Sequence, residues 1–148
     1  MVRFAQLGIA LGTLGAMIML MGLFPGVTGV TPARGIGVIQ ILIILAGFTL
    51  LIAGGLIYVK YMFYPHTSAN LAQQIAVRLA LTGLLFAGIA GMADALGFGS
   101  HAPELGEDVL LGPWQAVGLI GSFLLSSLSV ALYALTGHPN DNNGDAES

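Results

Sequence analysis

Four long apolar stretches, each almost free of charge, constrain the fold of this chain more than any other feature of its sequence. They cover residues 4–24, 32–64, 71–96 and 113–136, and each contains the run of about 18 apolar residues that a helix needs to cross a bilayer. The connections are short, so neighbouring helices are expected to run in opposite directions. The sequence therefore predicts an all-α integral membrane protein, folded as a four-transmembrane-helix antiparallel bundle.

The composition favours lipid over water as the solvent of this chain. Of its 148 residues, 56% are hydrophobic and 7% are charged, whereas an average soluble domain has about 25% charged residues. Four Lys and Arg residues are too few for nucleic-acid binding. The absence of cysteine excludes disulfides and a cysteine nucleophile. We expect one transmembrane domain over residues 1–136 and a polar, acidic C-terminal tail over residues 137–148.

Small residues recur at helical spacing in the predicted helices. Gly8, Gly12 and Ala16 follow a small-xxx-small pattern, which lets two helix backbones approach closely in lipid. Glycine is also common in membrane helices in general, so these stripes predict packing faces without naming a partner. The residues expected to pack against other helices are Gly8, Gly12, Gly15, Gly83, Ala87, Gly91, Gly118, Ser122 and Ser126.

Arg78 and Asp94 are the charged residues of the 71–96 helix. They are 16 residues apart, about 24 Å along a helix, and point to nearly opposite faces, so they cannot pair with each other. Asp94 shares a face with the small residues of its helix, which predicts an interhelical contact. We expect its partner to be Arg34, with Trp114 as another donor. A protonatable functional site at Asp94 is the less favoured alternative.

Aromatic and basic residues mark the expected membrane boundaries. The predicted interface anchors are Lys60, Tyr61, Tyr64, Arg78 and Trp114. Three of the four cations lie on the side of the N-terminus, the second connection and the tail, which predicts an N-in and C-in orientation. A bacterial inner membrane is the favoured location. The 32–64 stretch is about 50 Å long as a helix, so it must tilt, kink at Gly54-Gly55 or project into water.

No pattern typical of a cofactor or catalytic site occurs in the sequence. His66, His101 and His138 lie outside the helix centres, so none is placed as an intramembrane haem ligand, and their roles stay open. The acidic loop over residues 98–112 can be a solvated loop, a weak cation site or a docking surface for a basic partner. No cofactor is expected, although a bound lipid is compatible with the sequence, and the aromatic cluster near Lys60 also suits a quinone or pigment.

Three functions remain open at this level. The favoured one is a small non-catalytic accessory subunit of a larger membrane protein complex, with a respiratory or photosynthetic complex as the favoured host. Its expected partners are membrane lipids, other membrane subunits, and an extrinsic subunit at loop 98–112 or tail 137–148. The alternatives are a small homo-oligomeric channel or carrier, which needs a water-facing serine stripe, and a membrane redox protein or enzyme with an unrecognised cofactor site.

Overall fold

The computed structural model describes residues 2–29, 38–93 and 113–137 of the chain. These residues form four long helices and one short 3-10 helix, with no strand among them. The helices are α1 (Val2–Leu23), η1 (Pro25–Thr28), α2 (Val38–Phe63), α3 (Leu71–Met92) and α4 (Pro113–Thr136). Each of the four long helices is long and apolar enough to cross a membrane. The predicted helix content and the number of candidate spans are therefore confirmed for these segments.

Local sequence signals explain the helix ends that the structure describes. Asn70 caps α3: its side chain accepts a hydrogen bond from the Gln73 N–H at 2.8 Å, and the Gln73 side chain accepts one from the Asn70 N–H at 3.3 Å. Pro113 is the first residue of α4, where a missing N–H costs nothing. Beyond α1, Pro25 begins η1, and Gly29 ends it in the left-handed region with φ 74°. Two predicted helix ends fall outside the described residues. They are the start of the second helix at residue 32 and the end of the third at residue 96.

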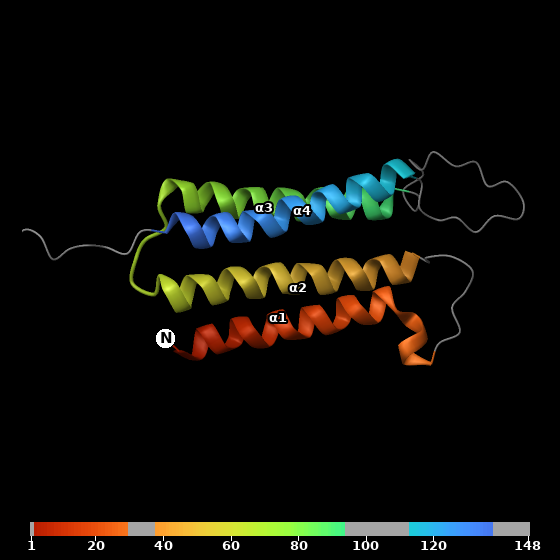
Figure 1. Cartoon of the computed structure of the whole chain (residues 1–148), viewed down its shortest axis with the longest axis horizontal. Helices are drawn as coiled ribbons and strands as arrows, with labels where there is room; N and C mark the ends of the chain where they lie inside the picture. The colour runs from red at the N-terminus through yellow and green to blue at the C-terminus, as the bar shows by residue number, and fades with distance from the viewer. Residues whose placement is uncertain (1, 30–37, 94–112, 138–148) are drawn as a thin grey trace, which may run out of the picture.

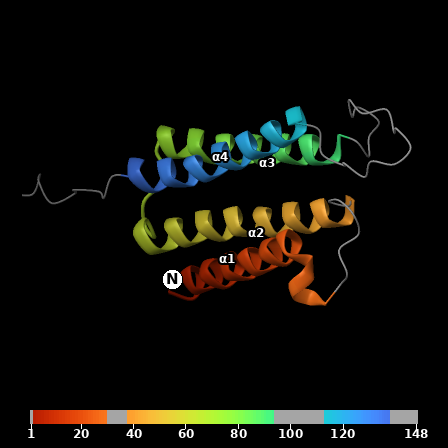
Figure 2. The ribbon, with the colours of Figure 1, turned by 45° about the vertical axis from the view of Figure 1, so that its right-hand side comes forward.

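The helices are arranged as two pairs, α1 with α2 and α3 with α4. Figures 1 and 2 show α1 and α2 lying side by side and running in opposite directions, and the same holds for α3 and α4. The helix α2 also contacts both α3 and α4, whereas α1 contacts no long helix except α2 among the described elements. The helix α1 is therefore the outermost element, and α2 joins the two pairs.

The α1–α2 pair is held by glycines whose partners are backbone atoms. Gly8, Gly15 and Gly22 are buried and lie seven residues apart on α1, the spacing that keeps one face turned towards a supercoiled partner. A Cβ atom at Gly15 would lie 2.6 Å from the Gly47 carbonyl oxygen, and one at Gly8 would lie 2.6 Å from the Tyr58 nitrogen. The two backbones therefore meet directly, with no room for a side chain between them.

The glycines of α2 face α1 in the same way, and the helix is continuous through them. Gly47 lies against Met19 and Gly15, and Gly54 lies against Gly12 and Gly8. No break interrupts α2 between Val38 and Phe63. Gly54 therefore serves close packing against α1, and the Gly54-Gly55 pair does not interrupt the helix.

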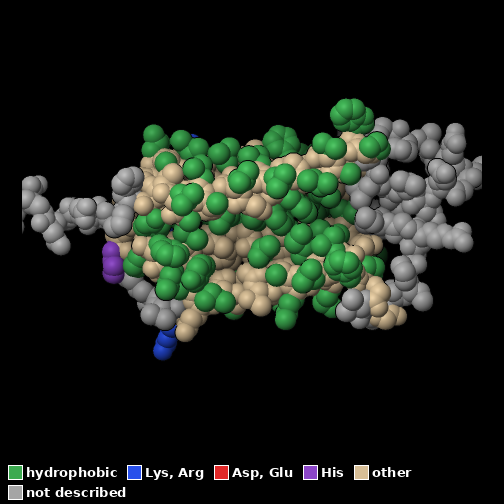
Figure 3. Space-filling view, viewed as in Figure 1, with side chains coloured by type: hydrophobic (Ala, Val, Ile, Leu, Met, Phe, Trp, Pro, Cys, Tyr) green, Lys and Arg blue, Asp and Glu red, His purple; other side chains and the backbone are tan. Residues whose placement is uncertain are grey.

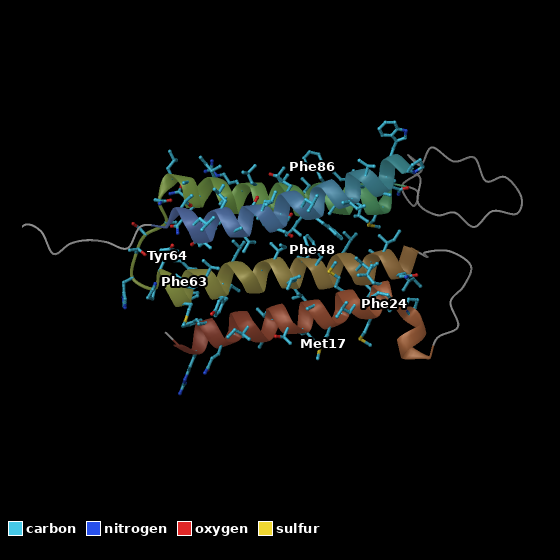
Figure 4. All side chains as sticks on the ribbon, viewed as in Figure 1. Met17, Phe24, Phe48, Phe63, Tyr64 and Phe86 are labelled. Atoms are coloured by element: carbon cyan, nitrogen blue, oxygen red, sulfur yellow. The ribbon has the colours of Figure 1, made fainter. Side chains whose placement is uncertain are left out.

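Larger apolar side chains fill the contact between α2 and the α3–α4 pair. The rings of Phe48 on α2 and Phe123 on α4 stack with their centroids 4.0 Å apart. Phe48 and Ile52 form a buried cluster with Ala80 of α3. Figure 4 shows Phe48 between α2 and the α3–α4 pair. The core of the molecule is thus a side-chain layer on one side of α2 and a backbone contact on the other.

The outer surface of the bundle is covered by apolar side chains. Figure 3 shows them along the whole length of one face. The exposed ones include Leu14 and Met17 of α1, Leu85 of α3 and Leu124 and Leu128 of α4. A soluble monomer rarely exposes an apolar surface of this extent, so the surface fits lipid or neighbouring apolar helices.

Candidate functional site

The α3–α4 interface carries the serines that a channel would need to expose to water. Ser122, Ser126 and Ser129 are buried, with Ser126 fully so. Ser126 Oγ donates across the interface to the Ala80 carbonyl oxygen at 3.0 Å. The other two hydroxyls donate to carbonyl oxygens four residues earlier in α4, at 2.7 Å each. This serine stripe therefore faces α3, and its donors are bonded to backbone carbonyls.

Small residues of α3 make room for this contact. A Cβ atom at Gly83 would meet Ser126 Oγ and would lie 3.0 Å from the Ser122 carbonyl oxygen. Ala87 is fully buried. A Cβ atom at Gly91 would lie 2.9 Å from Cγ2 of Ile41 on α2. The three predicted positions of α3 thus lie on one inward face and contact both α4 and α2.

Two of the predicted packing glycines lie differently from the rest. Gly118 on α4 is exposed, and a Cβ there would lie 3.5 Å from the Ala90 side chain, an ordinary contact. Gly12 on α1 has open space where its Cβ would be, although its backbone lies against Gly54. The glycines of α1 whose Cβ position faces α2 are Gly8 and Gly15, which are seven residues apart. The Cβ position of Gly12, four residues after Gly8, points away from α2.

A group of hydrogen bonds that no sequence pattern predicts joins three helices at one end of the bundle. We call it the carbonyl clasp. Side chains just after α2 and at the start of α3 donate to carbonyl oxygens in the last turn of α4 and at Gly137, the residue that follows it. The bonds are Tyr64 Oη to Ala134 at 2.7 Å and to Gly137 at 3.0 Å, Asn70 Nδ2 to Thr136 at 2.6 Å, and Gln73 Nε2 to Tyr133 at 3.4 Å.

The carbonyl clasp supplies hydrogen-bond donors to the unpaired carbonyl groups at the C-terminal end of α4. The last four carbonyls of a helix have no partner within it, and in lipid or at its boundary each unpaired group is costly. Asn70 and Gln73 also form the capping box of α3, so the same two side chains serve the start of one helix and the end of another. Figure 4 shows Tyr64 at this end of the bundle. The local capping box was visible in the sequence, but the distant carbonyls were not.

The predicted interface anchors lie at the two ends of the bundle or near them. Lys60 Nζ donates to the Thr67 carbonyl oxygen, and the Tyr61 ring stacks on Phe4 of α1 with centroids 5.0 Å apart. Arg78 is exposed on α3. Trp114, the second residue of α4, lies at the opposite end and is 82% exposed. Tyr64 is buried in the carbonyl clasp, so it packs within the bundle as well as lying at its end.

Several predicted positions lie outside the described residues. Asp94 and Arg34 are among them, so their expected contact stays a prediction, as do the roles of His101, the 98–112 loop and the tail after residue 137. His66 is described and exposed. Among the described residues, no group of three or more His, Cys, Asp or Glu side chains is placed to hold a metal ion.

The described charges have one sign and lie towards one end. Arg3, Lys60 and Arg78 are on the half of the bundle where α1 and α3 begin and α2 ends, and residues 2–29, 38–93 and 113–137 contain no Asp or Glu. Figure 3 shows a basic side chain and a histidine at this end, without acidic side chains on the visible face.

Comparisons with protein families, with curated proteins and with solved structures give no match. The function is therefore argued from the geometry of the bundle alone.

Proposed function

We propose that this chain is an antiparallel four-helix bundle that spans a membrane and serves as a small, non-catalytic subunit of a larger membrane protein complex. The favoured orientation is N-in and C-in in a bacterial inner membrane, because the described cations lie towards the end that would face the cytoplasm. Respiratory and photosynthetic complexes are the favoured hosts. Membrane lipids and other membrane subunits are the proposed partners.

The observation that carries this proposal is that the buried serine hydroxyls of α4 are hydrogen-bonded to backbone carbonyls. Ser122, Ser126 and Ser129 lie between α3 and α4 and donate to backbone carbonyls. Hydroxyls used in this way hold helices together in lipid, and the O–H donors of these three serines are already bonded within the bundle. This supports a structural role over the channel or carrier that a water-facing serine stripe would support.

The outer faces of the bundle also suit contact with neighbours. Three glycines of the long helices have open space where a Cβ would be, namely Gly12 on α1, Gly88 on α3 and Gly121 on α4. Small residues on an outer helix face let a second helix approach closely. These positions therefore offer a way to find which side of the bundle a partner subunit covers.

Purification from the native membrane tests the proposal. The tagged chain is solubilised in a mild detergent, separated by native electrophoresis, and its companions are identified by mass spectrometry. We expect a stable complex of fixed stoichiometry that contains other membrane subunits. Recovery of the chain alone, as a monomer or homo-oligomer, would contradict the proposal.

Leucine substitutions at the three glycines with open Cβ positions sharpen this experiment. Gly12→Leu, Gly88→Leu and Gly121→Leu add bulk where the chain itself has space, so the isolated bundle should keep its thermal stability. We expect at least one of them to lower the yield of the complex, because the added side chain would separate the partner helix from the bundle. Equal yield from all three would exclude a partner at these positions.

A cysteine at position 126 tests the channel alternative. The chain has no cysteine, so Ser126→Cys introduces a single thiol. Because Ser126 is fully buried against α3, we expect this thiol to resist a charged, water-soluble thiol reagent in reconstituted vesicles. His66→Cys, at an exposed position, is the reactive control. Fast labelling of both variants would favour a water-filled path along the serine stripe.

A further inference from the structure

Arg78 is the described cation that lies farthest from a helix end. Lys60 is in the last turn of α2 and Arg3 is the second residue of α1, whereas Arg78 lies seven residues beyond the start of α3. Seven residues correspond to about 10 Å along the helix axis. In a membrane-spanning α3, the Cα of Arg78 therefore lies within the hydrocarbon region, where an unpaired charge is costly.

The side chain of Arg78 faces outwards on an apolar helix surface. It is exposed, and Leu81 and Leu85, three and seven residues further along α3, are 57% and 64% exposed. Residues 2–29, 38–93 and 113–137 contain no carboxylate that could neutralise it. Asp94, 16 residues further along the sequence, lies outside the described residues. Among the described residues, the guanidinium therefore has no counter-charge and is open to a partner from the surrounding lipid.

The direction of the side chain indicates where this partner lies. Side chains on a helix lean towards its N-terminus, so Arg78 extends towards the end of α3 that Asn70 caps. Gln74, four residues earlier, is exposed on the same face, and its Nε2 donates to the Ala69 carbonyl oxygen at 3.2 Å. The guanidinium and this amide are therefore both on the outer face near the polar end of the bundle. A long basic side chain at this depth of a membrane-spanning helix can extend to the lipid headgroups.

We propose that Arg78, assisted by Gln74, binds the phosphate of an anionic phospholipid, whose acyl chain lies along Leu81 and Leu85. A guanidinium matches a phosphate because it donates two parallel hydrogen bonds to it. An anionic headgroup is favoured over a zwitterionic one because the described charges near this end are all positive. The proposal rests on membrane insertion of the bundle, but it does not require a partner subunit.

Fluorescence quenching by brominated lipids tests this site in the full-length chain. Leu81→Trp, made with Trp114→Phe, places the only tryptophan beside Arg78, and the protein is reconstituted in phosphatidylcholine vesicles. Quenching by bromine-labelled phosphatidylglycerol is then compared with quenching by bromine-labelled phosphatidylcholine. We expect about fivefold stronger binding of phosphatidylglycerol, the effect of one basic residue near a membrane surface.

Further substitutions test whether the positive charge of Arg78 causes the preference for phosphatidylglycerol. Arg78→Gln should bring the ratio of the two binding constants to about one, whereas Arg78→Lys should keep part of the preference, since a lysine also attracts the phosphate but without the paired donors. A reporter on another face, Leu124→Trp with Trp114→Phe, should show no preference in any of these variants, because Leu124 is exposed on α4 away from Arg78. Circular dichroism and gel filtration check that each variant is folded.

Two results would overturn the lipid site. One is equal binding of both lipids at the Leu81→Trp reporter, and the other is a lipid preference that Arg78→Gln leaves unchanged. In the second case, loss of a co-purifying subunit from the Arg78→Gln protein would assign Arg78 to a carboxylate of a protein partner. Loss of the lipid preference with the complex intact supports the lipid site and leaves the proposed subunit role unaffected.

Discussion

At the scale of single residues, most hydroxyl groups of the described helices donate to backbone carbonyls. Thr13, Thr49 and Thr82 each donate to the carbonyl four residues earlier in the same helix, at 2.8 Å. Ser126 differs, because its bond crosses to Ala80 of α3 and so joins two helices. This crossing is sterically possible because Gly83 has no side chain beside Ser126.

A methyl group at position 83 should therefore weaken the α3–α4 contact. Gly83→Ala places a Cβ against Ser126 Oγ and 3.0 Å from both the Ser122 carbonyl oxygen and the Ser126 nitrogen. We expect a loss of about 1–3 kcal/mol in the free energy of unfolding, the usual cost of overpacking. Titration with a denaturing detergent, followed by circular dichroism, measures it.

Gly88→Ala is the matched control in the same helix. A Cβ at Gly88 meets nothing within 4 Å, so the same chemical change should leave stability unaltered or raise it by up to about 1 kcal/mol through helix propensity. A Gly88 variant as unstable as the Gly83 variant would show that the glycines act through the backbone and not through the contact with Ser126.

At the scale of helices, the two pairs use different kinds of contact. Backbone meets backbone between α1 and α2, whereas α3 and α4 meet through small side chains and a hydrogen bond. Glycine contacts of the first kind contribute dispersion over a large area, because the helices approach more closely than side chains would permit. Since α1 contacts no other described long helix, its position depends on this one surface.

Substitutions on α1 should show which of its glycines hold it against α2. A Cβ at Gly15 would meet three backbone atoms of α2, among them the Gly47 oxygen at 2.6 Å, and backbone cannot yield unless the helices separate. We expect Gly15→Ala to cost about 1–3 kcal/mol of stability. Gly12→Ala should change it by less than about 0.5 kcal/mol, because its Cβ would point into open space.

Crosslinking between the two helices gives a second measurement of the same effect. Leu51→Cys and Ala16→Cys, placed in the cysteine-free chain, put two thiols near the Gly15 contact. Oxidation should form the disulfide readily in the parent and with Gly12→Ala, and more slowly with Gly15→Ala. If Gly12→Ala slowed it equally, the small-xxx-small pattern through Gly12, and not the seven-residue spacing, would describe the interface.

At the scale of the whole molecule, the two ends of the bundle differ in chemistry. One end has the described cations nearby and the carbonyl clasp, and the other has η1 and the exposed Trp114. A bilayer distinguishes such ends, because basic residues are retained on the cytoplasmic side during insertion. The charge distribution therefore supports one orientation of the bundle in a membrane.

Single cysteines test this orientation in intact cells. His66→Cys lies in the connection between α2 and α3, and Gly26→Cys lies in η1 at the other end. For an N-in and C-in protein, an impermeant thiol reagent should label Gly26→Cys in intact spheroplasts and His66→Cys only after the membrane is opened. The reverse pattern would show the opposite orientation, and labelling of both in intact spheroplasts would argue against spanning helices.

Properties that depend on a single segment can be predicted from the amino-acid sequence. The four helices follow from the length and hydropathy of each stretch, and the start of α3 follows from Asn70 and Gln73, which are three residues apart. The inward face of α3 also follows from one helix, because Gly83, Ala87 and Gly91 repeat at helical spacing.

Which helix faces meet depends on contacts between segments that lie far apart in the chain. All four helices are apolar on most sides, so hydrophobic periodicity does not show which neighbour each contacts, and glycine spacing on α1 fitted both Gly12 and Gly15. The structure turns Gly15 towards Gly47, the serine stripe towards α3, and Tyr64 towards carbonyls some 70 residues later in the chain. Such contacts depend on shape between distant segments, which no single segment encodes.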